Sequence, residues 1–111
     1  MVNTKIHPIE GDITKAGLGF KQEDRELLIN DLDVIINIAA SVDFTERLCD
    51  ALNINYHGAL RMQQLAIECK HLEVFTHVST CYVNSNIKGG FIKEDIYEWK
   101  EDHELMIKKI E

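Results

Sequence analysis

Short apolar runs alternate along this chain with longer stretches in which apolar residues have helical spacing. Residues 33–38 form a β-branched run without polar alternation, which is typical of a parallel strand covered on both faces. Between residues 44 and 69 apolar side chains recur every three or four positions, which predicts one long helix with an apolar stripe. Residues 73–79 predict another strand directly after this helix.

The flanking segments extend the same alternation. Residues 5–9 predict a short first strand that ends at Gly11 and Asp12, residues 22–30 a helix, and residues 94–111 an amphipathic helix. Alternating strands and helices with buried strands predict an α/β fold with a doubly wound parallel sheet.

In such sheets ligands bind beyond the carboxyl ends of the strands. Small or hydrogen-bonding residues follow each predicted strand here, and small residues let a ligand approach the backbone closely. The three candidate sets are Gly11-Asp12, Ala39-Ala40-Ser41 and Ser79-Thr80.

Composition narrows the classes of function. The formal net charge is −7 and the basic residues are scattered, which argues against a nucleic-acid partner. There is no apolar run of about 18 residues that would span a membrane. The three cysteines show no CxxC spacing and no HExxH motif accompanies them, so we expect reduced thiols and no metal site.

Five segments resemble the extended short-chain dehydrogenases, and the fatty acyl-CoA reductases in particular. They are Pro-Ile-Glu-Gly-Asp-Ile at 8–13, the segments 34–44 and 53–59 (the second with an Asn-x-x-Gly turn), His-Val-Ser-Thr-Cys-Tyr-Val-Asn at 77–84, and the segment 90–97. The resemblance implies a Rossmann-like NAD(P)-binding domain that residues 1–111 form only in part. The family's glycine-rich phosphate loop, its following strand and its Tyr-x-x-x-Lys pair have no counterpart in the sequence.

The resemblance also implies a cofactor, NADPH, and its contacts. Asp12 would accept a hydrogen bond from the adenine amino group, and Ala39 and Ala40 would line the path of the sugar and pyrophosphate. The full implied set is Asp12, Ile13, Asn37, Ala39, Ala40, Ser41 and Asn55. From the residues alone, Asp12 can alternatively be a turn residue after a strand, and the alanines can serve tight helix–strand packing.

For catalysis, the resemblance implies that Thr80 hydrogen-bonds the substrate carbonyl oxygen, with Ser79 as the alternative one residue earlier. Asn55 would hold the water and lysine of the active site. Alternatively, Ser79 and Thr80 satisfy backbone groups at a strand end, and Asn55 is a polar residue on a solvated helix face.

The implied reaction is NADPH-dependent reduction of a long-chain fatty acyl-CoA, through an aldehyde, to a fatty alcohol. The implied partners are that substrate and either the rest of a larger reductase or a partner chain. The location implied by the resemblance is the cytoplasmic side of peroxisomal or endoplasmic-reticulum membranes. By itself the chain is expected to be inactive and to bind NADPH weakly or not at all. Two alternatives stay open: another extended dehydrogenase, such as a thioester reductase or a nucleotide-sugar epimerase or dehydratase, and a non-catalytic binding piece.

Overall fold

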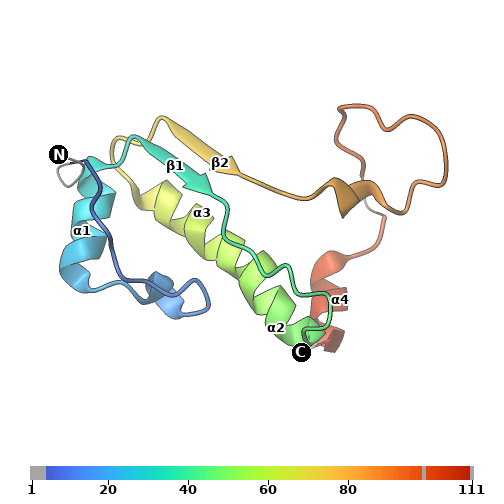
Figure 1. The fold of residues 1–111 in the computed structure, drawn as a ribbon, viewed down its shortest axis with the longest axis horizontal. Helices are drawn as coiled ribbons and strands as arrows, with labels where there is room; N and C mark the ends of the chain where they lie inside the picture. Colours follow the sequence, from blue (N-terminus) through green and yellow to red (C-terminus); the bar gives the residue numbers. More distant parts are fainter. Residues whose placement is uncertain (1–4, 99, 111) are drawn as a thin grey trace. The chain divides into compact units, whose positions relative to one another are not determined.

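Two parallel strands joined by a long helical crossover organise the first part of the chain (Figure 1). The computed structural model describes residues 5–98 and 100–110. Strand β1 (Val34–Asn37) pairs in parallel with β2 (Val74–His77), so that Val34 lies opposite Val74 and Asn37 opposite His77. These are the strands predicted at residues 33–38 and 73–79, each shorter by one or two residues at its ends.

The crossover is one helix in three consecutive parts. An α-helix, α2 (Leu48–Leu52), leads into a π-helical turn, η2 (Asn53–His57), and then into α3 (Gly58–Glu68). Helix α3 contacts both strands, as the apolar stripe predicted. Among the residues that the structure describes, the buried apolar side chains are Leu18, Ile35, Leu65 and Ala66.

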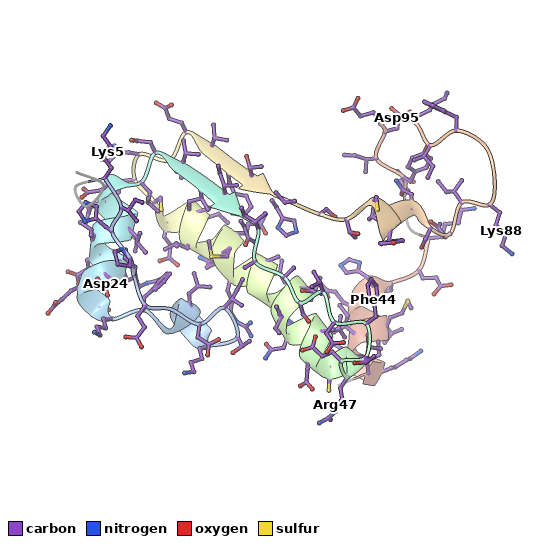
Figure 2. The ribbon with its side chains drawn as sticks, viewed as in Figure 1. Lys5, Asp24, Phe44, Arg47, Lys88 and Asp95 are labelled. Carbon is purple, nitrogen blue, oxygen red and sulfur yellow. The ribbon has the colours of Figure 1, made fainter. Side chains whose placement is uncertain are left out.

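The predicted start of this helix at residue 44 is wrong. The Asp43 carboxylate accepts hydrogen bonds from the backbone N–H of Thr45 at 2.8 Å and from its hydroxyl at 2.7 Å. A carboxylate that captures a nearby backbone N–H competes with helix formation, so the helix begins only after Arg47. Figure 2 labels Arg47 at this amino-terminal end of the helix.

Within the first part of the chain, residues 5–77, the described residues cover only one face of the two-stranded sheet, so the expectation of burial on both faces is wrong for this part. Ile35 is 6% exposed, whereas its neighbour Ile36 is 60% exposed. Successive side chains of a strand point to opposite faces. Helix α3 covers the face of Ile35, and no other described element among residues 5–77 covers the opposite face.

The first predicted strand, residues 5–9, is also wrong, because the structure shows an irregular segment there. A strand is stable when its backbone groups pair with a neighbouring strand. Among the described residues the sheet contains only β1 and β2, so residues 5–9 have no strand to pair with.

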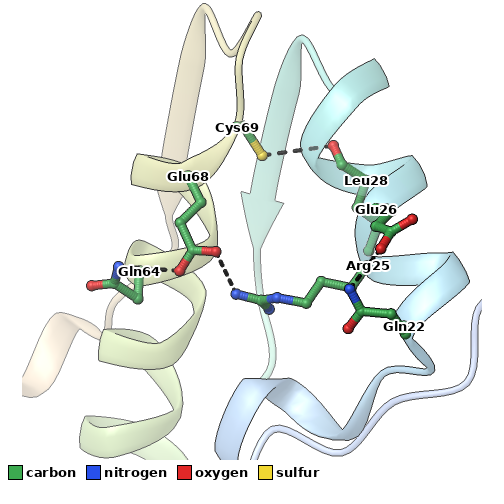
Figure 3. Close-up of polar contacts among 7 residues, drawn as sticks. All are labelled: Gln22, Arg25, Glu26, Leu28, Gln64, Glu68 and Cys69. Atoms are coloured by element: carbon green, nitrogen blue, oxygen red, sulfur yellow. Dashed lines mark hydrogen bonds and ion pairs between the residues drawn. The ribbon is translucent and has the colours of Figure 1, made fainter.

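Helix α1 (Gln22–Asp31) matches the prediction at residues 22–30. It is joined to the end of α3 by an ion pair between Arg25 and Glu68, whose closest nitrogen and oxygen lie 2.5 Å apart (Figure 3). The thiol of Cys69 donates to the carbonyl oxygen of Leu28 at 3.7 Å. Burial raises the pKa of the Cys69 thiol, the neighbouring charge of Glu68 raises it further, and Arg25 acts in the opposite direction.

The chain divides into two compact units, Met1–His77 and Val78–Glu111. All the elements above belong to the first unit. The second contains a short 3₁₀ helix, η3 (Cys81–Asn84), and helix α4 (His103–Ile110). No described helix of either unit has the length and apolar content needed to cross a bilayer.

The last helix is shorter than the predicted range 94–111. The Asp102 carboxylate accepts a hydrogen bond from the backbone N–H of Leu105 at 3.1 Å, which makes Asp102 the residue that caps the helix. The helix therefore begins at His103 and not at Glu94. Trp99 and Glu111, which the prediction included, lie outside the described residues.

Candidate functional site

A pocket of about 310 Å³ opens beside the carboxyl end of β1. This volume is at the lower end of the range for small-molecule sites. Four of the predicted cofactor residues, Asp12, Ile13, Asn37 and Ala39, line it. The complete lining is Gly11, Asp12, Ile13, Leu18, Phe20, Ile36, Asn37, Ile38, Ala39 and Met62.

The wall opposite the strand is the tight loop of residues 12–18, the Asp12 loop, in which three backbone hydrogen bonds link Asp12, Lys15 and Leu18. The N–H of Asp12 donates to the carbonyl oxygen of Leu18 at 2.7 Å. Leu18 has φ +63°, an unfavourable value for a side chain other than glycine, and its side chain is buried. Gly11 leaves room for the ring of Phe20, because a Cβ at position 11 would lie 2.5 Å from Phe20 Cε1.

The Asp12 carboxylate is fixed mainly by Thr14, two residues further along the chain. Its Oδ1 accepts from the backbone N–H of Thr14 at 2.9 Å and from the Thr14 hydroxyl at 2.6 Å. The Thr14 hydroxyl, and next the Thr14 N–H, hold the pKa of this carboxyl below its usual range, with a smaller contribution from Lys15. Asp12 is thus both the predicted turn residue and an ionised acceptor at the pocket wall, since a carboxylate can accept more than these two hydrogen bonds.

The opposite wall is organised by a buried amide. The Asn37 side chain is 3% exposed. Its Oδ1 accepts from the backbone N–H of Ala39 at 3.3 Å, and its Nδ2 lies 3.1 Å from Nδ1 of His77 on the neighbouring strand. With the oxygen turned toward Ala39, the amide nitrogen donates to His77. This pair fixes the direction in which the chain leaves β1.

Asn55 holds the loop that follows. Its Oδ1 accepts from the backbone N–H of Ser41 at 2.7 Å, and its Nδ2 donates to the Ser41 carbonyl oxygen at 3.1 Å. Asn55 lies within the π-helical turn, and such turns often occur at functional sites. Ala40 and Ser41 are not among the pocket-lining residues, and Ser41 is related to the site through this pair of hydrogen bonds.

Ser79 and Thr80 belong to the second unit, whereas the other predicted site residues belong to the first. Thr80 Oγ1 accepts from the backbone N–H of Tyr82 at 3.3 Å and caps η3. This is the backbone role that the sequence left open as an alternative. A hydroxyl that accepts in this way still has its own hydrogen to donate.

The sequence did not indicate that Leu18, Phe20 and Met62 line the pocket. No motif marks them, because only the folding of the loop onto α3 brings them to β1. The finished lining contains one carboxylate, one amide and apolar side chains, with no lysine or arginine. Such a set suits an uncharged planar ring better than a phosphate. The described part of the chain also has no group of three or more side chains able to hold a metal ion.

Comparison with known proteins shows the family to which this chain belongs. All of residues 1–111 match the NAD-binding family described as Male sterility protein. Over 107 residues, 96% of this chain, the sequence is 36% identical to fatty acyl-CoA reductase 1 of Xenopus laevis. It is 37% identical over 91 residues, 82% of the chain, to the chloroplastic fatty acyl-CoA reductase 2 of Arabidopsis thaliana, and 38% identical over 97 residues, 86% of the chain, to the alcohol-forming fatty acyl-CoA reductase of Simmondsia chinensis.

The chain therefore belongs to the NAD-binding family of male sterility proteins, and the relatives that it resembles are named fatty acyl-CoA reductases. The matches cover 20%, 15% and 20% of the three relatives' own lengths, so this chain corresponds to about a fifth or less of each.

Proposed function

We propose that the pocket beside β1 binds the adenosine end of a nicotinamide cofactor, NADPH, in a fatty acyl-CoA reductase. The observation that carries this proposal is the Asp12 carboxylate, whose pKa is lowered, at the wall of a pocket otherwise lined by one amide and by apolar residues. A carboxylate oxygen accepts the N–H of an adenine amino group, and apolar walls accommodate the ring faces. Family membership supports the choice of a nicotinamide cofactor.

The pocket fits only part of such a cofactor. Its lining has no cationic side chain, and Asp12 would repel a nearby phosphate. The Rossmann-like arrangement proposed for the domain binds the pyrophosphate at a glycine-rich loop before its first helix, and this sequence has no such motif. We therefore expect this chain to bind adenosine nearly as well as NADPH, and both in the millimolar range.

Binding is tested by titrating adenosine, NADPH and NADH into the isotope-labelled chain and following backbone amide shifts by NMR. The Asp12→Asn variant should weaken binding of all three ligands about tenfold, because a neutral amide oxygen replaces the ionised acceptor and hydrogen bonds to charged groups are the stronger ones. Asp43→Asn is the matched control, since Asp43 bonds Thr45 with the same geometry but does not line the pocket. Equal losses in the two variants, or no shifts in the wild-type chain, would contradict the proposal.

The proposed reaction has two reductive steps: a fatty acyl-CoA gives the aldehyde with release of CoA as the thiol, and the aldehyde gives the alcohol. Each step would take one hydride from a cofactor molecule and one proton. In this chain, Thr80 would donate its hydroxyl hydrogen to the substrate carbonyl oxygen and stabilise the negative charge that develops there. The hydrogen bond from the Tyr82 N–H to Thr80 Oγ1 supports this role, because it orients the hydroxyl.

The role of Thr80 is tested in the complete reductase that contains this chain. Thr80→Ala should lower kcat by about a hundredfold or more, and Thr80→Ser should retain most of it, since losing one oxyanion donor costs about 10²–10³ in kcat. Ser79→Ala is the neighbouring control. A larger loss for Ser79→Ala than for Thr80→Ala would transfer the role to Ser79.

A further inference from the structure

Arg61 of α3 connects the loop that lines the pocket to the π-helical turn η2. Its Nη1 donates to the carbonyl oxygen of Ile13 at 2.9 Å and to that of Asn53 at 3.2 Å, and its Nη2 donates to Oδ1 of Asn53 at 3.0 Å. Ile13 belongs to the Asp12 loop, and Asn53 is the first residue of the π-helical turn. One guanidinium therefore joins a loop to a helical turn 40 residues further along the chain.

All three acceptors are neutral oxygens. Among the residues that the structure describes, no ion pair involves Arg61, whereas Arg25 and Arg47 are each paired with a carboxylate. The guanidinium is planar and presents its N–H groups in a rigid fork, which a lysine ammonium cannot reproduce. Here the guanidinium holds three oxygens, one of Ile13 and two of Asn53, at fixed positions relative to one another.

The π-helical turn depends on one of these oxygens. The carbonyl of Asn53 accepts the backbone N–H of Gly58, the five-residue bond that defines the turn, and Arg61 donates to the same oxygen. Gly58 in turn leaves room for Ile13, since a Cβ at position 58 would lie 2.8 Å from Ile13 Cγ1. The guanidinium and the glycine hold the same loop against the same helical turn.

This turn carries Asn55, whose side chain holds both backbone groups of Ser41. We propose that Arg61 is a positioning residue for the pocket. It fixes the Asp12 loop directly, and through the π-helical turn and Asn55 it fixes the loop after β1. Its role in cofactor binding rests on the proposed function; its role in fixing the two loops does not.

The loop-fixing role is tested by amide hydrogen exchange on the full 111-residue chain, in Arg61→Gln and Arg61→Lys. The reporter is the Ser41 amide, and the reference is the Leu32 amide, which donates to Leu28 at the end of α1. We expect exchange at Ser41 to rise about tenfold in Arg61→Gln relative to Leu32, as for a lost hydrogen bond, and by a smaller factor in Arg61→Lys. Arg47→Gln, at an exposed arginine in the same unit, should change neither amide.

A uniform rise of both amides, or no change at Ser41, would overturn the inference, because it would make Arg61 a general stabiliser or a neutral residue. If Arg61→Gln does not fold, Arg61→Lys decides by the same criterion. Adenosine titration of the same variants separates the two proposals. Wild-type binding with a tenfold loss in Arg61→Gln supports both, and equal binding by wild type and variant overturns the positioning role in the pocket. Absence of wild-type binding together with a selective Ser41 response refutes the cofactor site and leaves the loop-fixing role supported.

Discussion

Replacing Gly58 with alanine should have two opposing effects on the free energy of unfolding, because Gly58 lies in close contact with Ile13. Gly58 has helical dihedral angles, φ −61° and ψ −44°, so that alanine there should gain about 1 kcal/mol from helix propensity. Against this, the new Cβ would lie 2.8 Å from Cγ1 and 3.1 Å from Cδ1 of Ile13. The Ile13 side chain is β-branched and stiff at χ1, so it cannot move away freely.

Overpacking of this kind costs about 1–3 kcal/mol. The net effect of Gly58→Ala is therefore a loss of roughly 0–2 kcal/mol in the free energy of unfolding. In an Ile13→Ala background the clash disappears, and the same change at position 58 should stabilise the chain by about 1 kcal/mol. The two changes should thus show a coupling free energy of about 1–3 kcal/mol.

The assay is urea denaturation of the wild type, both single variants and the double variant, followed by far-UV circular dichroism. The cycle is interpretable if the four proteins share one m-value, which indicates that the same surface is exposed on unfolding. The reasoning is refuted if Gly58→Ala stabilises the chain equally in both backgrounds. That outcome would mean that Ile13 does not pack against Gly58 in solution.

Three further predictions concern the core, one carboxylate and one thiol. Leu65→Ala should lower the free energy of unfolding by about 2–5 kcal/mol, because the Leu65 side chain is only 2% exposed. Leu60→Ala on the same helix should lower it by about 1 kcal/mol or less, because Leu60 is 45% exposed. Similar losses for the two variants in urea denaturation would contradict the burial pattern. The folded-state pKa of Asp12 is lowered, so its contribution to stability is present above the ordinary carboxyl pKa and is lost as pH falls through the lower folded value. Thr14→Val should raise the pKa of Asp12 toward its ordinary value in a carbon-detected NMR titration, and an unchanged midpoint would show that the hydroxyl is not its main cause. The raised pKa of Cys69 predicts slower alkylation at pH 8 in the native chain than in urea, and equal rates by peptide mass mapping would count against its burial.

Much of the first unit follows from periodicity. The β-branched run at β1 and the apolar stripe of α3 predicted a strand–helix–strand unit, and the two strands pair in parallel as expected. Local hydrogen bonds, which periodicity does not register, decided where helices begin. Asp43 delays the start of the long helix, and Asp102 sets the start of α4.

The candidate site was predictable only in part. Asp12 and Ala39 were found because they follow predicted strands and match family motifs, and both line the pocket. Their partners Phe20 and Met62 were not found, because each reaches the pocket through packing between distant segments. Arg61 carries no motif, and its three acceptors lie 8 and 48 residues away in the sequence.

The sequence by itself determined the strand–helix–strand unit, the family, and the residue types that follow each strand, because these depend on local spacing and on motifs that can be read along the chain. Only the tertiary structure decided which faces of the strands are buried, that residues 5–9 form no strand, and that Arg61 and Asn55 hold the two loops of the pocket. The physical reason is the same in each case. A strand needs a neighbouring strand to pair with, and a buried side chain needs a segment that covers it. Whether a distant part of the chain lies at that place is decided only by the folded arrangement.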